Sequence, residues 1–333
     1  MSVIICDYVH PLLRNKMPSF FQSTIPKEFL ANCHECNICK PVEASFVEQV
    51  RILGNSKCCN YQPKLPNFMV GYLLETKNTL FRARVFSNPH AQLSINPLGV
   101  CSNSSSIVQE KLNTLNDERL NRCTFYDNGR CGIWNGVNGI CASWICYSIA
   151  GFAGRKFWLH LGQLLERIEL ELASLCLEGL GIDTHVKTWS DSLPETVIND
   201  WQAEYPDREQ FYRSCSTIIK QVPKAHIEFL FKTKYNQAYN QLQQLYLKAF
   251  RTTLCATLTF NKTLEIVNDS GFYEIILEPT TGYGFKVNRF FLEALKQFDG
   301  RPITTVRQEL KRKYGASIPD DQLLLMQNNE VLI

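Results

Sequence analysis

The chain has 333 residues, of which 45% are hydrophobic and 20% are charged. These proportions are typical of a folded globular protein and exclude a disordered or collagen-like chain. The length is enough for two domains, or for one large domain with an appended module. The net charge is only +3, so we expect no bulk electrostatic binding to nucleic acid or to an anionic membrane surface.

The beginning of the chain shows no export signal. The first 16 residues, MSVIICDYVHPLLRNK, lack a positively charged start, and Asp7 interrupts their apolar stretch after four residues. A longer uncharged segment runs from Gly132 to Gly154, but its glycines and polar side chains make it weakly hydrophobic. The sequence therefore predicts a cytoplasmic protein without a membrane span.

Composition divides the chain into three regions. Residues 1–152 carry clustered cysteines and many loop-forming residues, which predicts an irregular region held together by its ligands. Residues 153–256 show apolar side chains at three- and four-residue steps, which predicts α-helices packing on the first region. Residues 257–333 begin with short apolar segments separated by turn residues, which predicts strands. The expected fold class is therefore α+β and mostly α-helical.

The expected elements follow in chain order. In the middle region, the apolar spacing predicts a long helix from Phe152 to about Gly179, and then helices over 207–221 and 224–254. In the last region, the turn sequences at 268–271 and 279–282 predict three strands joined by two tight turns. These strands are expected over 264–267, 272–277 and 283–287, and three helices are expected over 289–298, 304–314 and 320–327.

The cysteines are the most informative residues. The chain contains 14 of them, and nine form clusters. The clustered cysteines are Cys33, Cys36, Cys39, Cys58, Cys59, Cys123, Cys131, Cys141 and Cys146. Without an export signal, such spacing indicates metal or iron–sulfur ligation rather than disulfides. We expect the nine to converge on one or two metal centres, whose bonds would contribute folding free energy.

The spacing within the first cluster favours an iron–sulfur cluster. Cys33, Cys36 and Cys39 form a C-x2-C-x2-C run, which suits three corners of a 4Fe-4S cubane with a remote fourth ligand. The alternative is zinc, because nine thiolates could supply two four-thiolate sites. The adjacent Cys58 and Cys59 would bind metal at two different sites, or one would be a ligand and the other would line the same site.

The remaining cysteines stand alone in the sequence, and isolated cysteines are usually buried small hydrophobes. They are Cys6, Cys101, Cys176, Cys215 and Cys255. We place the last three of these in helical segments, where we expect alanine to be tolerated at a packing cost only. The aromatic residues near the third cluster are expected to be core residues that shield the metal from water, namely Trp134, Trp144, Phe152, Phe157 and Trp158.

The third cluster also carries a resemblance. The segment Cys-Thr-Phe-Tyr-Asp-Asn-Gly-Arg-Cys-Gly-Ile-Trp at 123–134, followed by Cys141, resembles the second half of the YkgJ-like family of zinc- or iron-chelating proteins. Lys57-Cys58-Cys59 resembles the double-cysteine element of that family, and Cys33 and Cys36 resemble its upstream pair. The resemblance covers about residues 30–155.

The segment departs from the family pattern in two places. The double cysteine lies 19 residues after Cys39 rather than close to it, and Val137-Asn138-Gly139 replaces the Arg-Pro that usually precedes the third cysteine. The resemblance implies metal ligation by these cysteines, and it does not define a reaction.

The C-terminal region carries a second resemblance. Glu-Pro-Thr-Thr-Gly-Tyr-Gly-Phe-Lys-Val-Asn at 278–288, Ala-Leu-Lys-Gln-Phe-Asp-Gly at 294–300 and Pro-Ile-Thr-Thr-Val at 302–306 resemble the PqqD-like domain, which recognises peptides in enzymes that modify ribosomally made peptides. The resemblance implies a winged module of three strands and three helices.

If the second resemblance holds, an extended peptide adds to the edge of the strand over 283–287, and the last helix forms the other wall of the groove. The residues expected to bind the peptide are Tyr283, Phe285, Val287, Leu323 and Leu324. The alternative is that these residues only close the core of the module itself.

Together these features favour a metal-binding protein that modifies a peptide or protein substrate. The alternative is a non-enzymatic metal-binding or redox-sensing protein whose wing binds a partner. No catalytic residue can be assigned, because the sequence has no closely spaced histidine pair, Walker loop or dinucleotide-binding glycine motif.

Overall fold

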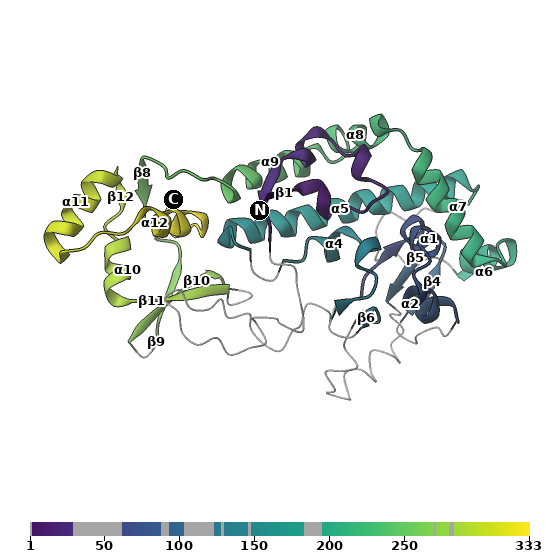
Figure 1. The fold of residues 1–333 in the computed structure, drawn as a ribbon, viewed down its shortest axis with the longest axis horizontal. Coiled ribbons are helices and arrows are strands. Elements are labelled where there is room, and N and C mark those ends of the chain that lie inside the picture. Colours follow the sequence, from purple (N-terminus) through teal and green to yellow (C-terminus); the bar gives the residue numbers. More distant parts are fainter. Residues whose placement is uncertain are drawn as a thin grey trace. The chain divides into compact units, whose positions relative to one another are not determined.

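The structure is a computed structural model that describes residues 2–28, 62–87, 93–102, 123–127, 130–145, 148–182, 195–269, 271–279 and 283–333. Among these residues about 56% are helical and 18% lie in strands, which confirms the α+β class with a helical majority. Figure 1 labels the elements in chain order. Within the described ranges, no helix is both long enough and apolar enough to cross a bilayer.

The chain forms two compact units. The first consists of Met1–Lys27, Lys57–Trp144 and Trp158–Leu242, and the second consists of Glu28–Ser56, Ile145–Phe157 and Gln243–Ile333. The long helix α5 (Gly151–Gly179) begins in the second unit and continues in the first. Each unit therefore draws on more than one of the three regions that composition distinguishes.

Helices dominate the first unit. Helix α5 matches the helix predicted from Phe152 to Gly179, and α7 (Arg208–Gln221) matches the helix predicted over 207–221. The other helices are α1 (Asn67–Glu75), α2 (Thr79–Arg82), α4 (Gly139–Ala142), α6 (Glu195–Glu204), α8 (Lys224–Lys232) and α9 (Asn236–Ala249), the last of which ends in the second unit.

The strands of the first unit are short and antiparallel. Strand β1 (Ser2–Ile4) pairs with β2 (Thr24–Pro26), and β5 (Gly99–Ser102) lies between β3 (Leu65–Pro66) and β4 (Leu93–Asn96). A hairpin joins β6 (Tyr126–Asp127) to β7 (Arg130–Cys131). Strand β7 ends at Cys131, one of the clustered cysteines. A second clustered cysteine, Cys123, lies three residues before β6.

Aromatic side chains fill the core of the first unit. Trp158, Trp201 and Tyr212 are almost completely buried. The rings of Tyr8 and Trp158 have centroids 4.5 Å apart, and each such aromatic pair contributes about 0.5–1.5 kcal/mol beyond the area it buries. The expectation that Trp158 is a core residue is therefore confirmed.

Region 1–152 is more regular in its described part than we expected. Helix α1 lies within it, and seven of the nine residues of α1 are buried. A helix buried on nearly every side shows no stripe of alternating apolar and polar residues. The three- and four-residue spacing that reveals α5 in the sequence is therefore missing from α1.

The helix predicted over 224–254 is wrong as a single element. Helix α8 ends at Lys232 and α9 begins at Asn236. In the intervening turn, Lys234 donates to the Glu171 carboxylate of α5 at 2.6 Å, and the Tyr235 N–H bonds the Leu230 carbonyl at 2.9 Å. These contacts stabilise the break, which the continuous apolar pattern did not show.

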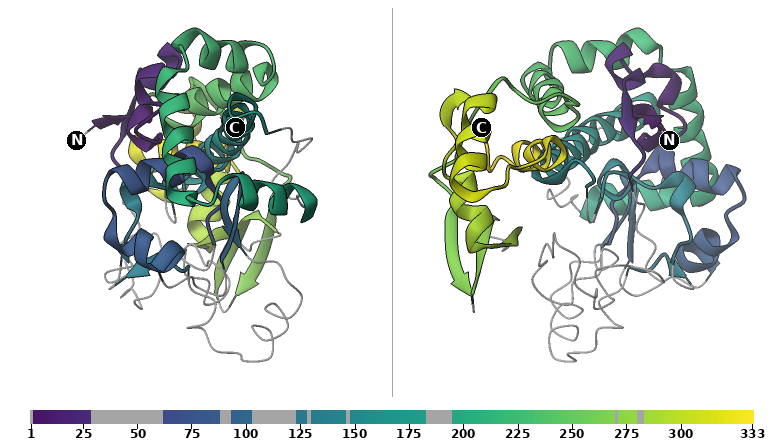
Figure 2. Two further views of the ribbon diagram at one scale, coloured as in Figure 1. Left: turned by 90° about the vertical axis from the view of Figure 1, so that its right-hand side faces the viewer. Right: turned by 60° about the vertical axis from the view of Figure 1, so that its left-hand side comes forward.

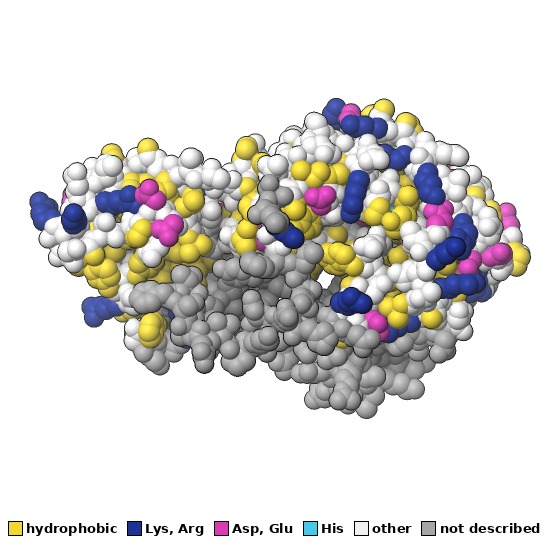
Figure 3. All heavy atoms as spheres, viewed as in Figure 1, with side chains coloured by type: hydrophobic (Ala, Val, Ile, Leu, Met, Phe, Trp, Pro, Cys, Tyr) yellow, Lys and Arg dark blue, Asp and Glu magenta, His cyan; other side chains and the backbone are white. Residues whose placement is uncertain are grey.

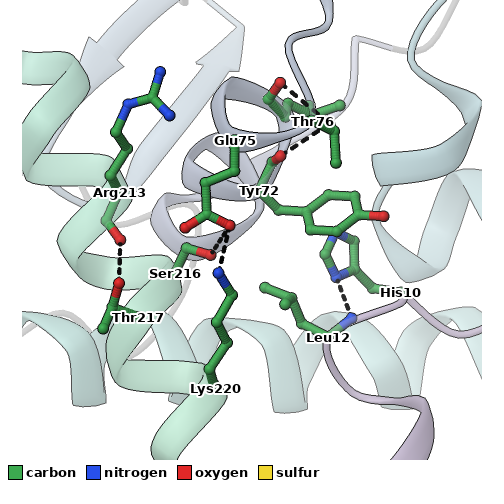
Figure 4. A network of polar contacts seen from close by, with 10 residues as sticks. His10, Leu12, Tyr72, Glu75, Thr76, Arg213, Ser216, Thr217 and Lys220 are labelled. Atoms are coloured by element: carbon green, nitrogen blue, oxygen red, sulfur yellow. Dashed lines mark hydrogen bonds and ion pairs between the residues drawn. The ribbon is translucent and has the colours of Figure 1, made fainter.

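A close approach between α1 and α7 organises one side of the first unit. The Cβ of an alanine at Gly71 would collide with the Tyr212 backbone carbonyl of α7. Beside this contact, the Glu75 carboxylate of α1 accepts hydrogen bonds from the Ser216 hydroxyl at 3.1 Å and from Lys220 at 2.6 Å (Figure 4). Glycine at position 71 is thus required for the helices to lie close enough for these bonds.

Gly71→Ala is expected to destabilise the protein by about 1–3 kcal/mol, the usual cost of overpacking a core. The obstructing atom belongs to the backbone and cannot rotate away. Urea unfolding measures the change. Gly179→Ala is the matched control, because its nearest neighbour is the flexible Ile218 side chain at 3.3 Å. An alanine there is expected to be neutral or slightly stabilising, since it favours the helix, and equal costs at the two positions would contradict the close approach.

The second unit contains the strands and helices expected at the C-terminus. The strands are β9 (Glu265–Asp269), β10 (Phe272–Glu278) and β11 (Tyr283–Asn288), and the helices are α10 (Arg289–Leu295), α11 (Ile303–Tyr314) and α12 (Asp320–Asn328). Each boundary lies within three residues of its prediction. The strands form an antiparallel sheet in the order β11-β10-β9. Figure 2 shows strands of this region as light-green arrows.

A second, two-stranded sheet in this unit was not predicted. Strand β8 (Thr257–Thr259) pairs with β12 (Asp299–Pro302), and Phe260 bridges to Leu332 near the end of the chain. Both strands are short, and Asp299-Gly300 favours a helix stop rather than a strand. Their pairing depends on partners about 40 residues apart, which local pattern does not show.

One face of the larger sheet packs on the helices. Ile275 and Leu277 of β10 and Phe285 and Val287 of β11 belong to a buried core. The helices contribute Leu292, Leu295, Val306, Leu310, Leu323 and Met326 to the same core. Phe152, from the first turn of α5, also packs into it.

Candidate metal-ligating site

Three of the nine clustered cysteines lie in the described part of the chain. Cys123 precedes β6, Cys131 ends β7, and Cys141 lies in α4. The other six predicted ligands, Cys33, Cys36, Cys39, Cys58, Cys59 and Cys146, lie outside the described residues. Within those residues, no group of three or more His, Cys, Asp or Glu side chains is arranged to hold a metal ion.

Cys123 begins a tight turn that directs backbone N–H groups toward its sulfur. The Tyr126 N–H donates to the Cys123 carbonyl at 3.0 Å, which closes the turn. The Phe125 N–H donates to the Cys123 Sγ at 3.4 Å. A thiol is a weak acceptor, whereas hydrogen bonds to sulfur stabilise metal-bound thiolates and tune iron–sulfur centres. The local backbone therefore suits a thiolate at this position.

The two thiols of this hairpin influence each other. Burial raises the pKa of Cys123 to about 11; the Phe125 N–H opposes this rise, and the nearby Cys131 adds to it. In register, Cys131 lies opposite Tyr126, three residues after Cys123. At neutral pH the Cys123 thiol therefore keeps its proton, which a bound metal ion would have to displace.

The hairpin is held by residues that follow α1. Arg84 donates to the carbonyl groups of Thr124 and Tyr126, the latter at 2.9 Å, and pairs with Asp127 at 3.3 Å. Asn78 donates to the Gly132 carbonyl at 3.0 Å. These bonds to main-chain atoms position the hairpin independently of its side chains.

Cys141 is held by a different set of contacts. The Asn138 side chain accepts the Cys141 N–H at 3.0 Å and donates to the Lys64 carbonyl at 3.1 Å. Glu169 of α5 accepts the Gly139 N–H at 2.7 Å. A side chain at Gly139 would collide with Leu165, so glycine allows α4 to lie directly on α5.

Glu169 is a buried carboxyl group beneath α4. Burial raises its pKa well above the usual value; the Gly139 N–H opposes this rise, and Glu166 adds to it. Because the unfolded chain ionises at lower pH than the folded chain, this group lowers folding stability as pH rises above its unfolded pKa. Glu169→Gln keeps the acceptor and removes the titration.

We expect Glu169→Gln to be more stable than the wild type at pH 7, and to lose this advantage near pH 4. Urea unfolding at both values measures the difference. A wild type that gains stability over the glutamine variant between pH 4 and pH 7 would show that the carboxyl is ionised in the folded protein.

Gln62 and Glu28 lie on either side in sequence of the residues that carry Cys33 to Cys59. Each bonds a part of the chain close in sequence to another clustered cysteine. Gln62, three residues after Cys59 in sequence, accepts the Thr124 N–H at 3.0 Å, beside Cys123. In the second unit, the buried Glu28 accepts hydrogen bonds from the Ser148 hydroxyl at 2.6 Å and from the Ile149 N–H at 2.9 Å. Ser148 follows Cys146 by two residues.

One buried polar atom next to Cys123 has no hydrogen-bond partner among the described residues. Thr124 is 5% exposed, and its hydroxyl bonds none of the groups that the structure describes. An orphaned hydroxyl is costly in a dry interior. A thiolate- or sulfide-bearing centre beside Cys123 would supply the missing acceptor, so the residues present fit such a centre.

The aromatic residues expected to shield the metal behave differently from one another. Phe152 and Phe157 are buried, as expected, but Trp134 and Trp144 are 39% and 49% exposed. The prediction that these two tryptophans are core residues is therefore wrong. They lie on short irregular segments, where burial depends on tertiary neighbours rather than on helical spacing.

The isolated cysteines are mostly buried. Cys6, Cys176 and Cys215 are buried, and the Cys176 thiol donates to the Cys215 carbonyl at 3.5 Å between α5 and α7. The helical position expected for Cys255 is wrong, because α9 ends at Ala249 and Cys255 is exposed in the connection to β8.

The residues expected to bind peptide divide into two groups. The side chains of Phe285, Val287 and Leu323 are buried in the core of the second unit, and Leu324 is half-buried. Tyr283 begins β11. A peptide at this edge would therefore meet the backbone of β11 rather than these three buried side chains.

Sequence reasoning missed the residues that position the cysteine-bearing segments, namely Arg84, Asn78, Glu169 and Gln62. Only Asn138 had a local signal, since Asn-Gly before an apolar stretch suits a helix N-cap. Comparison with protein families, curated proteins and solved structures finds no significant match to this chain.

Proposed function

We propose that the nine clustered cysteines bind iron–sulfur centres, and that the protein modifies a peptide or protein captured by residues 257–333. The main support is the Cys123 turn, where a half-buried thiol accepts a backbone N–H and lies beside the Thr124 hydroxyl, which has no partner among the described residues. The resemblances to YkgJ-like chelating proteins and to PqqD-like modules point in the same direction.

The described hydrogen bonds favour two groups of ligands. Glu28, which precedes the C-x2-C-x2-C segment in the sequence, bonds Ser148 and Ile149, which follow Cys146 in the sequence. Cys33 is the fifth residue after Glu28, and five residues of chain reach at most about 18 Å. We therefore propose that Cys33, Cys36 and Cys39 hold three irons of one 4Fe-4S cluster, whose fourth iron either takes Cys146 or stays open to substrate.

The second group would use the remaining five cysteines. Gln62 bonds the chain beside Cys123, and the Lys64 carbonyl bonds Asn138 beside the helix of Cys141. Cys58 or Cys59 would then join Cys123, Cys131 and Cys141, and the other member of the pair would line the site. Zinc is the alternative metal here, because four thiolates suit it equally.

The C-terminal module is joined directly to the segment that follows Cys146. Asn329, at the end of α12, accepts the Phe152 N–H at 2.8 Å and thereby caps α5. Lys156 pairs with Glu330, and Arg155 pairs with Glu278 of β10 at 3.1 Å. These contacts lie within the second unit and connect substrate capture to the proposed cluster.

The chain supplies the edge that capture requires. Strand β11 pairs with β10 on one side, and no other strand of the described residues pairs with it. An extended peptide can add to such an edge through backbone hydrogen bonds. A bound iron–sulfur cluster would supply one-electron chemistry, while the module holds the peptide.

Metal and acid-labile sulfide analysis of anaerobically purified protein tests this proposal. We expect iron and sulfide together, with a visible absorption band that changes when S-adenosylmethionine or substrate is added to a cluster with an open coordination site. Zinc without sulfide would replace the iron assignment. A cluster that ignores both additions would favour the non-enzymatic alternative, because a structural centre has every position filled.

A further inference from the structure

The two edges of the C-terminal sheet differ in charge on one face. Phe285 and Val287 point into the core, so the alternate residue Lys286 points to the opposite face of β11. Lys286 lies directly opposite Glu274 of β10, which in turn lies opposite Val267 of β9. A single row across the sheet therefore runs from Val267 through Glu274 to Lys286.

We propose that a peptide bound at the β11 edge places an acidic side chain beside Lys286. This inference rests on the proposed capture of a peptide by the module. A residue added laterally to a sheet shares the face of its neighbour, and opposite charges on neighbouring strands attract while like charges repel. Lys286 makes other contacts as well, but its three N–H donors can serve more than one acceptor.

The other edge of the same sheet would select the opposite charge. Strand β9 presents Glu265 and Val267 on this face, and both are exposed. A peptide added beside Glu265 would favour a basic side chain. The charge preference of the bound peptide therefore identifies the edge that it occupies.

Selection from a displayed library of random twelve-residue peptides on the immobilised full-length chain tests the inference. We expect the enriched peptides to share an Asp or Glu at one position, and replacing that residue by Lys in a synthetic peptide to weaken binding about fivefold. Lys286→Gln should abolish this preference. Glu265→Gln is the matched control, because it changes charge on the same face but at the other edge, and it should leave the preference intact.

The outcomes separate the inference from the proposed function. Enriched peptides with no charge preference, or with an acidic preference that survives Lys286→Gln, would overturn the role of Lys286 and leave peptide capture standing. Enriched peptides that share a basic side chain, and lose this preference in Glu265→Gln, would show that the peptide binds at the β9 edge instead. A selection that enriches no peptide would remove both the inference and the peptide-capture part of the proposed function.

Discussion

Replacing Cys131 by serine is expected to leave the purified protein with substoichiometric metal and markedly lower stability. Serine is a poor ligand for a soft metal, and structural thiolate sites contribute on the order of 10 kcal/mol to folding. Because the described hairpin is only two residues long in each strand, its packing can replace little of that contribution. Metal analysis and thermal unfolding of the variant measure both effects.

Cys176→Ala is the matched control for this experiment. Cys176 is fully buried on α5 and bonds the Cys215 carbonyl, so its loss should cost about 1–3 kcal/mol in packing and hydrogen bonding. Its metal content should match that of the wild type. If Cys131→Ser retains full metal and unfolds like the wild type, then Cys131 is not a ligand and the hairpin is a structural element only.

Acid is expected to destabilise the protein through His10. This side chain is buried, and its Nδ1 accepts the Leu12 N–H at 3.3 Å (Figure 4). Its Nε2 bonds no group in the described part of the chain. Its ring meets that of Tyr72 edge-on, with centroids 4.8 Å apart. Burial, and secondarily the charge of Arg14, lowers the pKa of His10 to about 3.

The folding stability depends on pH because the folded and unfolded chains protonate His10 at different pH values. The unfolded chain binds a proton at His10 below pH 6.5 and the folded chain does so only near pH 3, so the stability present at neutral pH falls as pH drops through this window. The loss is at most about 5 kcal/mol, at 1.36 kcal/mol for each unit between the two pKa values. Below pH 3 this contribution stays constant.

His10→Phe isolates this effect from the titration of carboxylates. The phenyl ring keeps the contact with Tyr72 and leaves the Leu12 N–H without its acceptor, which should cost about 1 kcal/mol at pH 7. Urea unfolding between pH 7 and pH 4 should then show a shallower loss for the variant than for the wild type. Parallel curves would mean that His10 gains its proton in the folded protein at the same pH as in the unfolded chain.

The charged surface gives no comparable prediction. On the face that Figure 3 shows, the basic and acidic side chains of the described residues are interspersed. The ion pairs Arg82–Glu209 and Lys224–Glu228 both involve partly exposed side chains. Exposed pairs of this kind contribute about 0–1 kcal/mol each, so single charge substitutions there should be nearly neutral.

The sequence alone determined the elements whose residues repeat at short intervals. Helix α5 and strands β10 and β11 were predictable because one face of each is buried, and burial of one face imposes a period of 3.6 or 2 residues. The turn glycines between the C-terminal strands marked their ends. The cysteine spacing predicts metal ligation, because few other functions require so many thiols so close together, and this stays a prediction.

Tertiary structure decided what depends on distant partners. The break between α8 and α9 is stabilised by Glu171, about 60 residues earlier, and α1 has no visible period because neighbours cover nearly all of it. The cysteine-bearing segments are positioned by the side chains of Arg84, Glu169 and Gln62, which bond backbone atoms. Every residue type except proline offers the same backbone N–H and C=O groups, so the bonded segment needs no particular sequence. Such contacts carry no local signal, so only the folded chain shows which side chains position the hairpin that follows Cys123.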